Sequence, residues 1–305
     1  MEDYPRALPE LERRFSTDTA CRDYLAALRW PDGFVCPRCQ GRQAYVMSRG
    51  LWLCRQCRRQ TSVMAGTIFQ DSRLPLTLWF RAIWYVTSQK NGVSALGIQR
   101  VLGLGSYQTA WGWLHKLRRA MVRPGRDRLG GTVEVDETYW GAQEEGVVGR
   151  LTQDKALIAV AAQQDGPHKI GRIRMRCIPD VTRATLRGFI AEAIEPGSVV
   201  RTDGFSAYRG LQGYRHEPVV VTGSGKTADE LLPRVHRVVS LLKRWLMGTH
   251  QGAVRHHHLD YYLDEFTFRF NRRTSGSRGK LFYRLVQQAV QVEPHPYRRI
   301  IHPQG

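Results

Sequence analysis

The chain has 305 residues, of which 42% are hydrophobic. This size can bury a full core and leaves room for about two domains. Lysine and arginine number 46 against 27 aspartates and glutamates, which gives a net charge of +19. Such a field favours a polyanion, and nucleic acid is the commonest polyanion inside a cell. A basic surface with no assigned partner is the alternative, and charge alone does not separate DNA from RNA.

Neither membrane insertion nor secretion is expected. The longest apolar run, residues 157–162, is far shorter than the roughly 20 residues that a membrane-spanning helix needs. The N-terminal sequence MEDYPRALPELERRF contains no apolar signal core. We therefore expect no membrane partner and a cytoplasmic location.

Four of the six cysteines form two Cys-x-x-Cys pairs, Cys36/Cys39 and Cys54/Cys57. The fourteen residues between the pairs suffice for a β-hairpin. In a reducing compartment, four thiolates at this spacing favour a structural zinc ribbon over disulfides, and a redox dithiol would account for only one of the pairs. We assign residues 1–62 to an N-terminal segment and zinc ribbon.

Residues 63–126 are predicted to be helical. Ser94 and Ser106 can each cap a helix, and Gly103 can end the first of the two. Two short helices joined by a glycine-containing turn are typical of a helix-turn-helix, although an ordinary packed helical pair has the same pattern. The polar face opposite the apolar stripe is predicted to contact DNA, and it carries Gln108, His115, Lys116 and Arg119.

After a linker near residue 125, strands and helices alternate. Three strands are expected first, then one helix and two more strands, at 132–140, 155–162, 171–178, 182–194, 198–204 and 217–222. Long helices follow. This order is typical of an RNase H-like α/β domain. We assign the domain to residues 127–290 and a C-terminal tail to residues 291–305.

Two aspartates end predicted strands of this domain. In TVEVDETYW, Glu134 and Asp136 point to the face opposite Val133 and Val135, because successive residues of a strand alternate. Asp203 ends the fourth strand. If these two strands are neighbours, both carboxylates meet at one edge, where with substrate phosphate they suffice to bind Mg²⁺. Each aspartate alone is weaker evidence, since an aspartate at a strand end commonly caps a turn.

The helix predicted at residues 232–248 supplies a third candidate. His236 and Lys243 are two turns apart and therefore face the same site. An imidazole nitrogen can complete a metal coordination sphere, and a lysine can approach a phosphate. The buried stripe of the helix is expected at Val235, Val239, Leu242 and Leu246.

Several separate motifs, in order along the chain, resemble one protein family. They are the CPRC/CRQC ribbon, RRQTSVMAGTIFQDSRLPLTLWFRAIW after it, VEVDETYWGA, RTDGFSAYRGL, HRVVSLLKRWLMGTH and YLDEFTFRFNRR. Together they span about residues 18–273. They resemble the bacterial insertion-sequence transposases of the ISXO2-like group, which join an N-terminal zinc ribbon to a DDE domain.

The resemblance implies a transposase that binds the terminal inverted repeats of its element and performs Mg²⁺-dependent strand cleavage and transfer. Asp136 and Asp203 match the first two catalytic acids, and Lys243 matches the basic residue two turns after the third. His236 stands where many relatives carry Glu or Asn, which makes this site a DDH variant. An imidazole ligand would shift the preference towards Mn²⁺. A two-ion mechanism of this kind needs no covalent protein intermediate.

Glu265 is the rival for the third acidic position, although an i,i+4 pair with Arg269 is its expected role. The arginines of RFNRR, namely Arg269, Arg272 and Arg273, are predicted to hold DNA by phosphate contact, with a solvated face as the alternative. Because two transposon ends must be brought together, the resemblance also implies a homodimer or larger assembly.

Two other functions stay open. A DNA-binding regulator would use the ribbon and the helical pair while the α/β domain is an inert remnant, a hypothesis motivated by His236. A structure-selective nuclease on the same fold would cleave DNA without joining it, irrespective of the end sequence.

Overall fold

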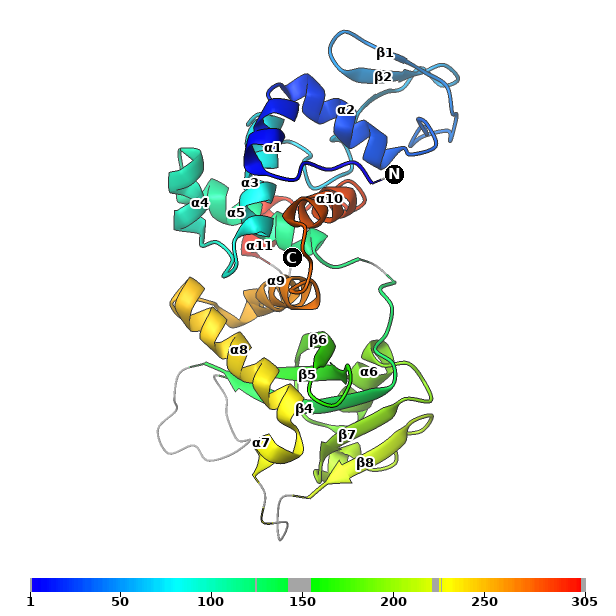
Figure 1. Ribbon diagram of the computed structural model, residues 1–305. Coiled ribbons are helices and arrows are strands. Elements are labelled where there is room, and N and C mark those ends of the chain that lie inside the picture. The colour runs from blue at the N-terminus through cyan, green and yellow to red at the C-terminus, as the bar shows by residue number, and fades with distance from the viewer. Residues whose placement is uncertain (1, 124, 142–154, 221–224, 226, 303–305) are drawn as a thin grey trace. The chain divides into compact units, whose positions relative to one another are not determined.

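The computed structural model describes residues 2–123, 125–141, 155–220, 225 and 227–302. The chain forms two compact units, one of residues Met1–Arg123 with Thr274–Gly305 and the other of residues Pro124–Arg273 (Figure 1). Within the described ranges, none of the helices has the length and apolarity that crossing a membrane requires.

The first unit begins with two helices and a small sheet. Helices α1 (Leu8–Arg14) and α2 (Asp18–Arg29) precede the antiparallel strands β1 (Ala44–Val46), β2 (Leu51–Cys54) and β3 (Gln60–Ser62). The predicted hairpin between the cysteine pairs is thus confirmed. Its apolar core is very small, with Phe34 buried beside Cys36 and Cys54. A unit this small commonly depends on a metal for its stability.

Five further helices complete the first unit: α3 (Leu76–Ser88), α4 (Ala95–Leu102), α5 (Tyr107–Ala120), α10 (Arg278–Ala289) and α11 (Tyr297–Ile301). Helix α10 packs against α2, α3 and α5. Its Phe282 contacts the rings of Phe15, Tyr24 and Phe80. The predicted end of the α/β domain at residue 290 is therefore corrected to residue 273, because α10 buries its apolar face in the helical unit.

The helical pair α4 and α5 has the predicted caps. Ser94 accepts a hydrogen bond from the N–H of Gly97, and Ser106 accepts one from the N–H of Thr109. Gly103 ends α4 with a φ of 62°, a left-handed conformation that glycine adopts without strain. A helical pair with a short turn is confirmed, while its contact with DNA stays a prediction.

The second unit is built on a five-stranded sheet in the order β6-β5-β4-β7-β8. Its strands are β4 (Thr132–Trp140), β5 (Ala156–Gln164), β6 (Ile170–Ile178), β7 (Val199–Asp203) and β8 (Arg215–Val219). The first three pair antiparallel, while β4, β7 and β8 are parallel. This mixed order is consistent with the predicted RNase H-like domain. The fifth strand begins two residues earlier than predicted, and the predicted strand residues 221 and 222 lie outside the described residues.

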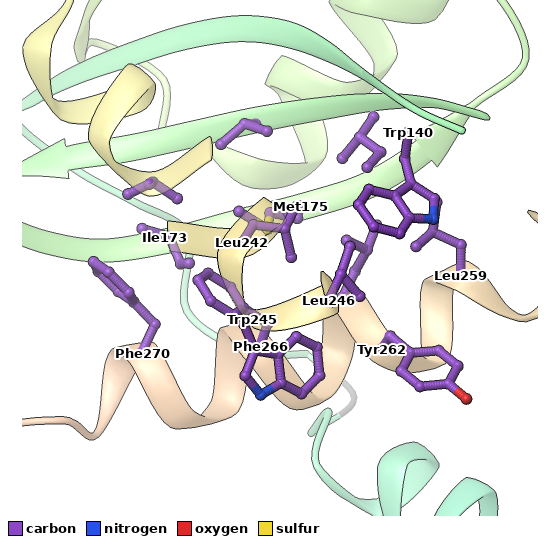
Figure 2. Packing of buried hydrophobic residues seen from close by; sticks show 14 of the residues in the cluster. Trp140, Ile173, Met175, Leu242, Trp245, Leu246, Leu259, Tyr262, Phe266 and Phe270 are labelled. Atoms are coloured by element: carbon purple, nitrogen blue, oxygen red, sulfur yellow. The ribbon is translucent and has the colours of Figure 1, made fainter. Parts of the chain in front are cut away.

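Helices cover both faces of this sheet. Helix α6 (Arg183–Ala193) packs on the face that carries Val133 and Val135. Helices α8 (Pro233–His250) and α9 (Leu259–Asn271) pack on the opposite face, where Trp245 and Phe266 belong to one buried cluster with Met175 (Figure 2). Because side chains of a strand alternate, Glu134 and Asp136 lie on the α8 face.

The buried stripe of α8 matches the prediction at Val235, Leu242 and Leu246. At the remaining position Val238 is fully buried, whereas Val239 is only partly buried against the same cluster. The stripe therefore follows an i, i+3, i+7 spacing, which changes one core residue but leaves His236 on the flank of the helix.

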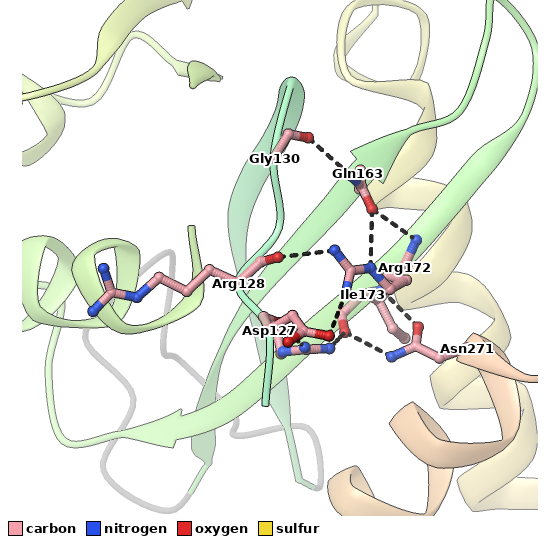
Figure 3. A network of polar contacts seen from close by, with 8 residues as sticks. Asp127, Arg128, Gly130, Gln163, Arg172, Ile173 and Asn271 are labelled. Carbon is pink, nitrogen blue, oxygen red and sulfur yellow. Dashed lines mark hydrogen bonds and ion pairs between the residues drawn. The ribbon is translucent and has the colours of Figure 1, made fainter. Parts of the chain in front are cut away.

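Side chains of helix α9 form hydrogen bonds with β6, an edge strand of the sheet. Strand β6 is an edge strand, so its outer backbone groups need partners. Asn271 supplies two, because its side chain accepts a hydrogen bond from the N–H of Ile173 at 2.7 Å and donates one to the carbonyl of Ile173 at 3.1 Å (Figure 3). Asp260 accepts another from the N–H of Cys177 at 2.8 Å. Side chains of α9 thus form hydrogen bonds with β6 that a sixth strand would otherwise form.

We expect Asn271→Ala to lower the free energy of unfolding of the second unit by about 1–3 kcal/mol, since it removes both partners of a backbone amide and carbonyl. Hydrogen exchange of the β6 amides should report this loss directly. The exposed Ser240→Ala on α8 is the matched control and should leave the exchange rates unchanged. Equal protection of β6 in both variants would contradict the edge-strand role of Asn271.

Candidate active site

The two predicted acidic residues lie on adjacent parallel strands. Strands β4 and β7 pair at Thr132↔Val199, Val133↔Val200 and Glu134↔Arg201, an offset of 67 positions. The same offset, carried two residues further, puts Asp136 level with Asp203 on one face of the sheet. Asp203 is the last residue of β7, as predicted, and accepts a hydrogen bond from the N–H of Phe205 at 3.1 Å.

Asp136 is not at a strand end as predicted but is the fifth residue of the nine-residue strand β4. The physical reason is that β4 stays paired antiparallel with β5 as far as Trp140↔Ala156. The parallel pairing with β7 extends only to Glu134. Asp136 therefore lies two residues beyond the last β4–β7 pair, at the level where β7 ends, while β5 still supports the strand on the other side.

The buried residue Tyr208 lies close to both aspartates. Burial, followed by the negative charges of Glu137, Asp136 and Asp203, raises the pKa of Tyr208 well above its ordinary value. The phenol of Tyr208 is therefore within electrostatic reach of both aspartates, although Glu137 has the larger effect. Sequence reasoning missed this residue, because a tyrosine five positions after Asp203 resembles an ordinary core residue.

His236 lies next to Asp136. Its Nε2 is 3.5 Å from Oδ2 of Asp136, and its Nδ1 is 3.0 Å from Oδ1 of Asp229. Both His236 and Asp136 are partly accessible, with side chains 28% and 19% exposed. Helix α8 thus brings His236, the predicted third residue of the site, next to Asp136, the predicted first residue, although they are 100 positions apart in the sequence.

A buried ion pair fixes the start of α8 on β4. Glu134 accepts hydrogen bonds from the N–H groups of Arg234 and Val235 at 2.7 and 3.0 Å, and from Nη1 of Arg234 at 2.8 Å. The other guanidinium nitrogens of Arg234 donate to the carbonyls of Gly166, Pro167 and Lys169 in the turn between β5 and β6. Since His236 comes directly after Val235, this clamp determines where the imidazole lies.

Glu134→Gln should destabilise the second unit by about 3 kcal/mol, because Arg234 is then left buried with an uncompensated charge. Protection of the β4 amides in hydrogen exchange measures the loss. Glu217 pairs with Arg201 and Arg215 at the surface, so Glu217→Gln is the matched control. The control should cost less than about 1 kcal/mol. Comparable losses in the two variants would contradict a special role for the buried pair.

Lys243 lies on α8 two turns after His236 and is exposed. Partial burial of its ammonium group, followed by repulsion from Lys155, lowers the pKa of Lys243. Lys155 directly precedes β5, whose first residue pairs with Trp140 at the far end of β4. Two cations therefore lie beyond His236 in the direction of the β4 C-terminus, where they suit a phosphate group.

Two carboxylates and an imidazole are a donor set that fits Mg²⁺ or Mn²⁺, the imidazole suiting Mn²⁺ better. Asp136 and His236 are close enough to share one ion, and Asp203 is level with Asp136. In the described part of the chain, however, only the four cysteines bring three or more ligand atoms within 4.8 Å of one another. The three residues thus do not form a closed cage, and each ion would be bound by two of them.

The four predicted zinc ligands form that closed cluster, with Cys36, Cys39, Cys54 and Cys57 within 4.8 Å of one another. Each pair belongs to a tight turn. The N–H of Gln40 donates to the carbonyl of Cys36, and that of Arg58 donates to the carbonyl of Cys54. Gln40 and Arg58 both have positive φ values, 60° and 58°, which makes the two turns alike.

Backbone N–H groups in these turns favour thiolates. Although burial opposes the effect, the N–H groups of Cys39 and Arg38 help to lower the pKa of Cys36 to about 6. The N–H of Cys57 lowers the pKa of Cys54, again against burial. Four sulfurs converging from two tight turns are the donor set of a structural zinc site.

The predicted DNA-contacting residues of α5 divide into two groups. Gln108 is exposed, while Lys116 and Arg119 are partly exposed. Burial and then the positive charges of Arg119, Arg299 and Lys116 lower the pKa of His295 to about 4, so all three cations are within electrostatic reach of this imidazole. His115 is fully buried, and its predicted place on an exposed face is wrong. It contacts the ring of Trp111 and Nη1 of Arg118, because α5 is buried on more than one side.

The arginines of RFNRR have partners within their own unit. Arg269 binds Glu265 at 2.8 Å, which confirms the predicted i,i+4 pair and occupies the rival third acid. Arg272 donates to the carbonyl of Phe268, and Arg273 donates to the carbonyls of Phe270 and Gly171. Of the three arginines, Arg273 therefore contacts β6, whereas the contacts of Arg269 and Arg272 lie within α9.

The mixed sheet, the two aspartates on its adjacent strands and the four-cysteine ribbon are the features expected of a transposase with a DDE-type domain. Residues 128–271 match the family model described as the ISXO2-like transposase domain, and residues 16–60 match the transposase zinc-ribbon domain. The chain belongs to the family of ISXO2-like transposases with an N-terminal zinc ribbon.

A curated relative is similar over most of the chain. It is the uncharacterized protein in transposable element ISH50 of Halobacterium salinarum, 27% identical over 285 residues, which cover 84% of this chain and 92% of the relative. Because this relative is archaeal, the likeness does not assign the chain to bacteria.

Proposed function

We propose that the chain is a DNA transposase that binds the terminal inverted repeats of an insertion sequence and catalyses metal-dependent strand cleavage and strand transfer. The observation that carries the proposal is the meeting of Asp136 and His236 at 3.5 Å, with Asp203 at the same level of the neighbouring strand, inside an ISXO2-like transposase domain.

Asp136, Asp203 and His236 would hold Mg²⁺ or Mn²⁺. When bound, the ions supply activation of the attacking hydroxyl and stabilisation of the leaving oxygen in an in-line displacement. The register of β4 and β7 supports this set because it brings Asp136 and Asp203 to one level of the sheet, and the Glu134–Arg234 clamp lies next to His236 in the sequence. Lys243 provides a cation for a DNA phosphate beyond the site.

DNA binding is supported by the net charge of +19 and by Lys116, Arg119 and Arg299 of the helical unit, whose positive charges all act on His295. Gln108, Lys116 and Arg119 are the proposed DNA contacts of the helical unit, and the partly exposed Arg272 and the exposed Arg273 are those of the second unit. A structural zinc in the ribbon and a homodimer or larger assembly on two transposon ends complete the proposal.

Incubation of the purified chain with labelled transposon-end DNA and Mg²⁺ or Mn²⁺ tests the proposal. We expect nicking at the end sequence, followed by joining of the freed 3′-hydroxyl to target DNA. Tight binding without nicking would favour a DNA-binding regulator instead. Cleavage without joining, irrespective of the end sequence, would favour a nuclease.

A further inference from the structure

We propose that Asp229 is a positioning residue that holds His236 with its Nε2 atom facing Asp136. The inference rests on the proposed function, because it assigns a role beside the proposed ion site. Asp229 lies on the short helix α7 (Ala228–Leu231), which packs against α8.

The two nitrogens of His236 face two different carboxylates. Nδ1 is 3.0 Å from Oδ1 of Asp229, a hydrogen-bond distance. An ionised carboxylate only accepts hydrogen bonds, so Nδ1 is the atom that donates to Asp229, and Nε2 is the atom left to face Asp136. Nε2 in turn lies 3.5 Å from Oδ2 of Asp136. This separation is close to the roughly 3 Å between neighbouring ligands of an octahedral ion whose bonds are 2.0–2.1 Å long.

An imidazole needs such an outer partner more than a carboxylate does. Its ring has one lone pair in the neutral form, and either a ring flip or the other tautomer would turn an N–H towards the ion. Metal-binding histidines almost always donate their second N–H to a carboxylate, a carbonyl or water. Asp229 meets that requirement at His236, and the clamp at Glu134 fixes the backbone only two residues earlier.

A merely stabilising role does not explain Asp229. Its side chain is 82% exposed, and exposed ion pairs of this kind contribute little to stability. Its neighbour Glu230 provides the structural contact of α7, because it accepts a hydrogen bond from the N–H of Thr227 while its own N–H donates to Oγ1 of Thr227. The start of the helix is thus held by Glu230, and Asp229 is left to orient the imidazole.

The first experiment measures Mn²⁺ binding to the zinc-loaded full chain by electron paramagnetic resonance. Asp229→Asn should weaken Mn²⁺ binding about 10- to 100-fold, the usual effect of removing an outer carboxylate. Glu230→Gln is the matched control. It removes the same charge one residue away and keeps the cap, since glutamine also serves in a capping box, so binding should change less than about twofold. No weakening in Asp229→Asn, or equal weakening in both variants, would overturn the proposal.

The second experiment repeats the substitution in the His236→Glu background. A glutamate has no N–H to donate, so Asp229→Asn should cause no loss of Mn²⁺ binding there. The same loss in both backgrounds would show that Asp229 acts through its charge alone, and the proposal would fall.

Nitrogen-15 NMR of the metal-free chain provides a readout that needs no bound ion. The wild type should show an Nδ1–H of His236 that is hydrogen-bonded, and Asp229→Asn should weaken or lose that hydrogen bond. An unchanged Nδ1–H signal in the variant would contradict the positioning role. A wild-type chain with the expected hydrogen bond that binds no Mn²⁺ would instead contradict the proposed function, so the two failures are distinguishable.

Discussion

Asp136→Asn should abolish nicking of transposon-end DNA, with a loss of at least about 10³-fold in rate, while the chain still folds and binds the DNA. The magnitude follows because ions in such a site supply several kcal/mol of transition-state stabilisation, and each 1.4 kcal/mol is about tenfold in rate. Asparagine keeps the shape of the side chain and its acceptor for the N–H of Glu137. Single-turnover cleavage of labelled DNA measures the rate.

The matched control is Asp180→Asn. Asp180 lies in the same unit, and its side chain accepts a hydrogen bond from the N–H of Thr182. Asparagine can make the same turn, so this variant should cleave at the wild-type rate. Asp203→Asn should reproduce the loss seen at Asp136, since the two residues are level on adjacent strands. Undiminished cleavage by the Asp136 variant would show that the acidic pair is not the catalytic centre.

Features that depend on local spacing could be predicted from the sequence. The cysteine pairs predict their own cluster, and Ser94 and Ser106 cap the helices they precede. The alternation of TVEVDETYW places Asp136 on one face, and the order of strands places β4 beside β7. Each of these depends on residues near one another in sequence or on a topological rule.

Features that depend on distant partners could not be predicted. From the sequence, Glu134 resembles a second acid of the site. In the structure it is fully buried and paired with Arg234, which is 100 positions away in the sequence. His115 lies on the polar flank of α5, but that helix is buried on more than one side. Asn271 and Arg273 resemble part of a basic run for DNA, and their partners are backbone groups of β6. A helical pattern shows which residues share a face, but not how many faces are covered.

Removal of zinc should unfold the ribbon and leave the five-stranded sheet intact. Structural zinc contributes about 10–16 kcal/mol to the folding of small isolated domains, far more than a core as small as that of the ribbon can supply. The four-thiolate site stabilises only the turns that hold it, whereas the sheet has its own clusters on both faces. Hydrogen exchange should therefore rise to unprotected rates in residues 34–62 and stay slow in residues 132–140.

Cys36→Ser and Cys54→Ser should lose zinc by elemental analysis in the same way, while Cys177→Ser, outside the ribbon, should retain it.

DNA binding should weaken in the two ribbon variants, because residues 34–60 contain six arginines and no lysine, aspartate or glutamate. For every arginine that no longer neutralises a phosphate, the logarithmic slope of binding against salt should become shallower by about 0.9. Unchanged zinc content in the two ribbon variants would contradict the assignment of the four cysteines as zinc ligands. Loss of protection in both the ribbon and the sheet would mean that the two do not fold independently.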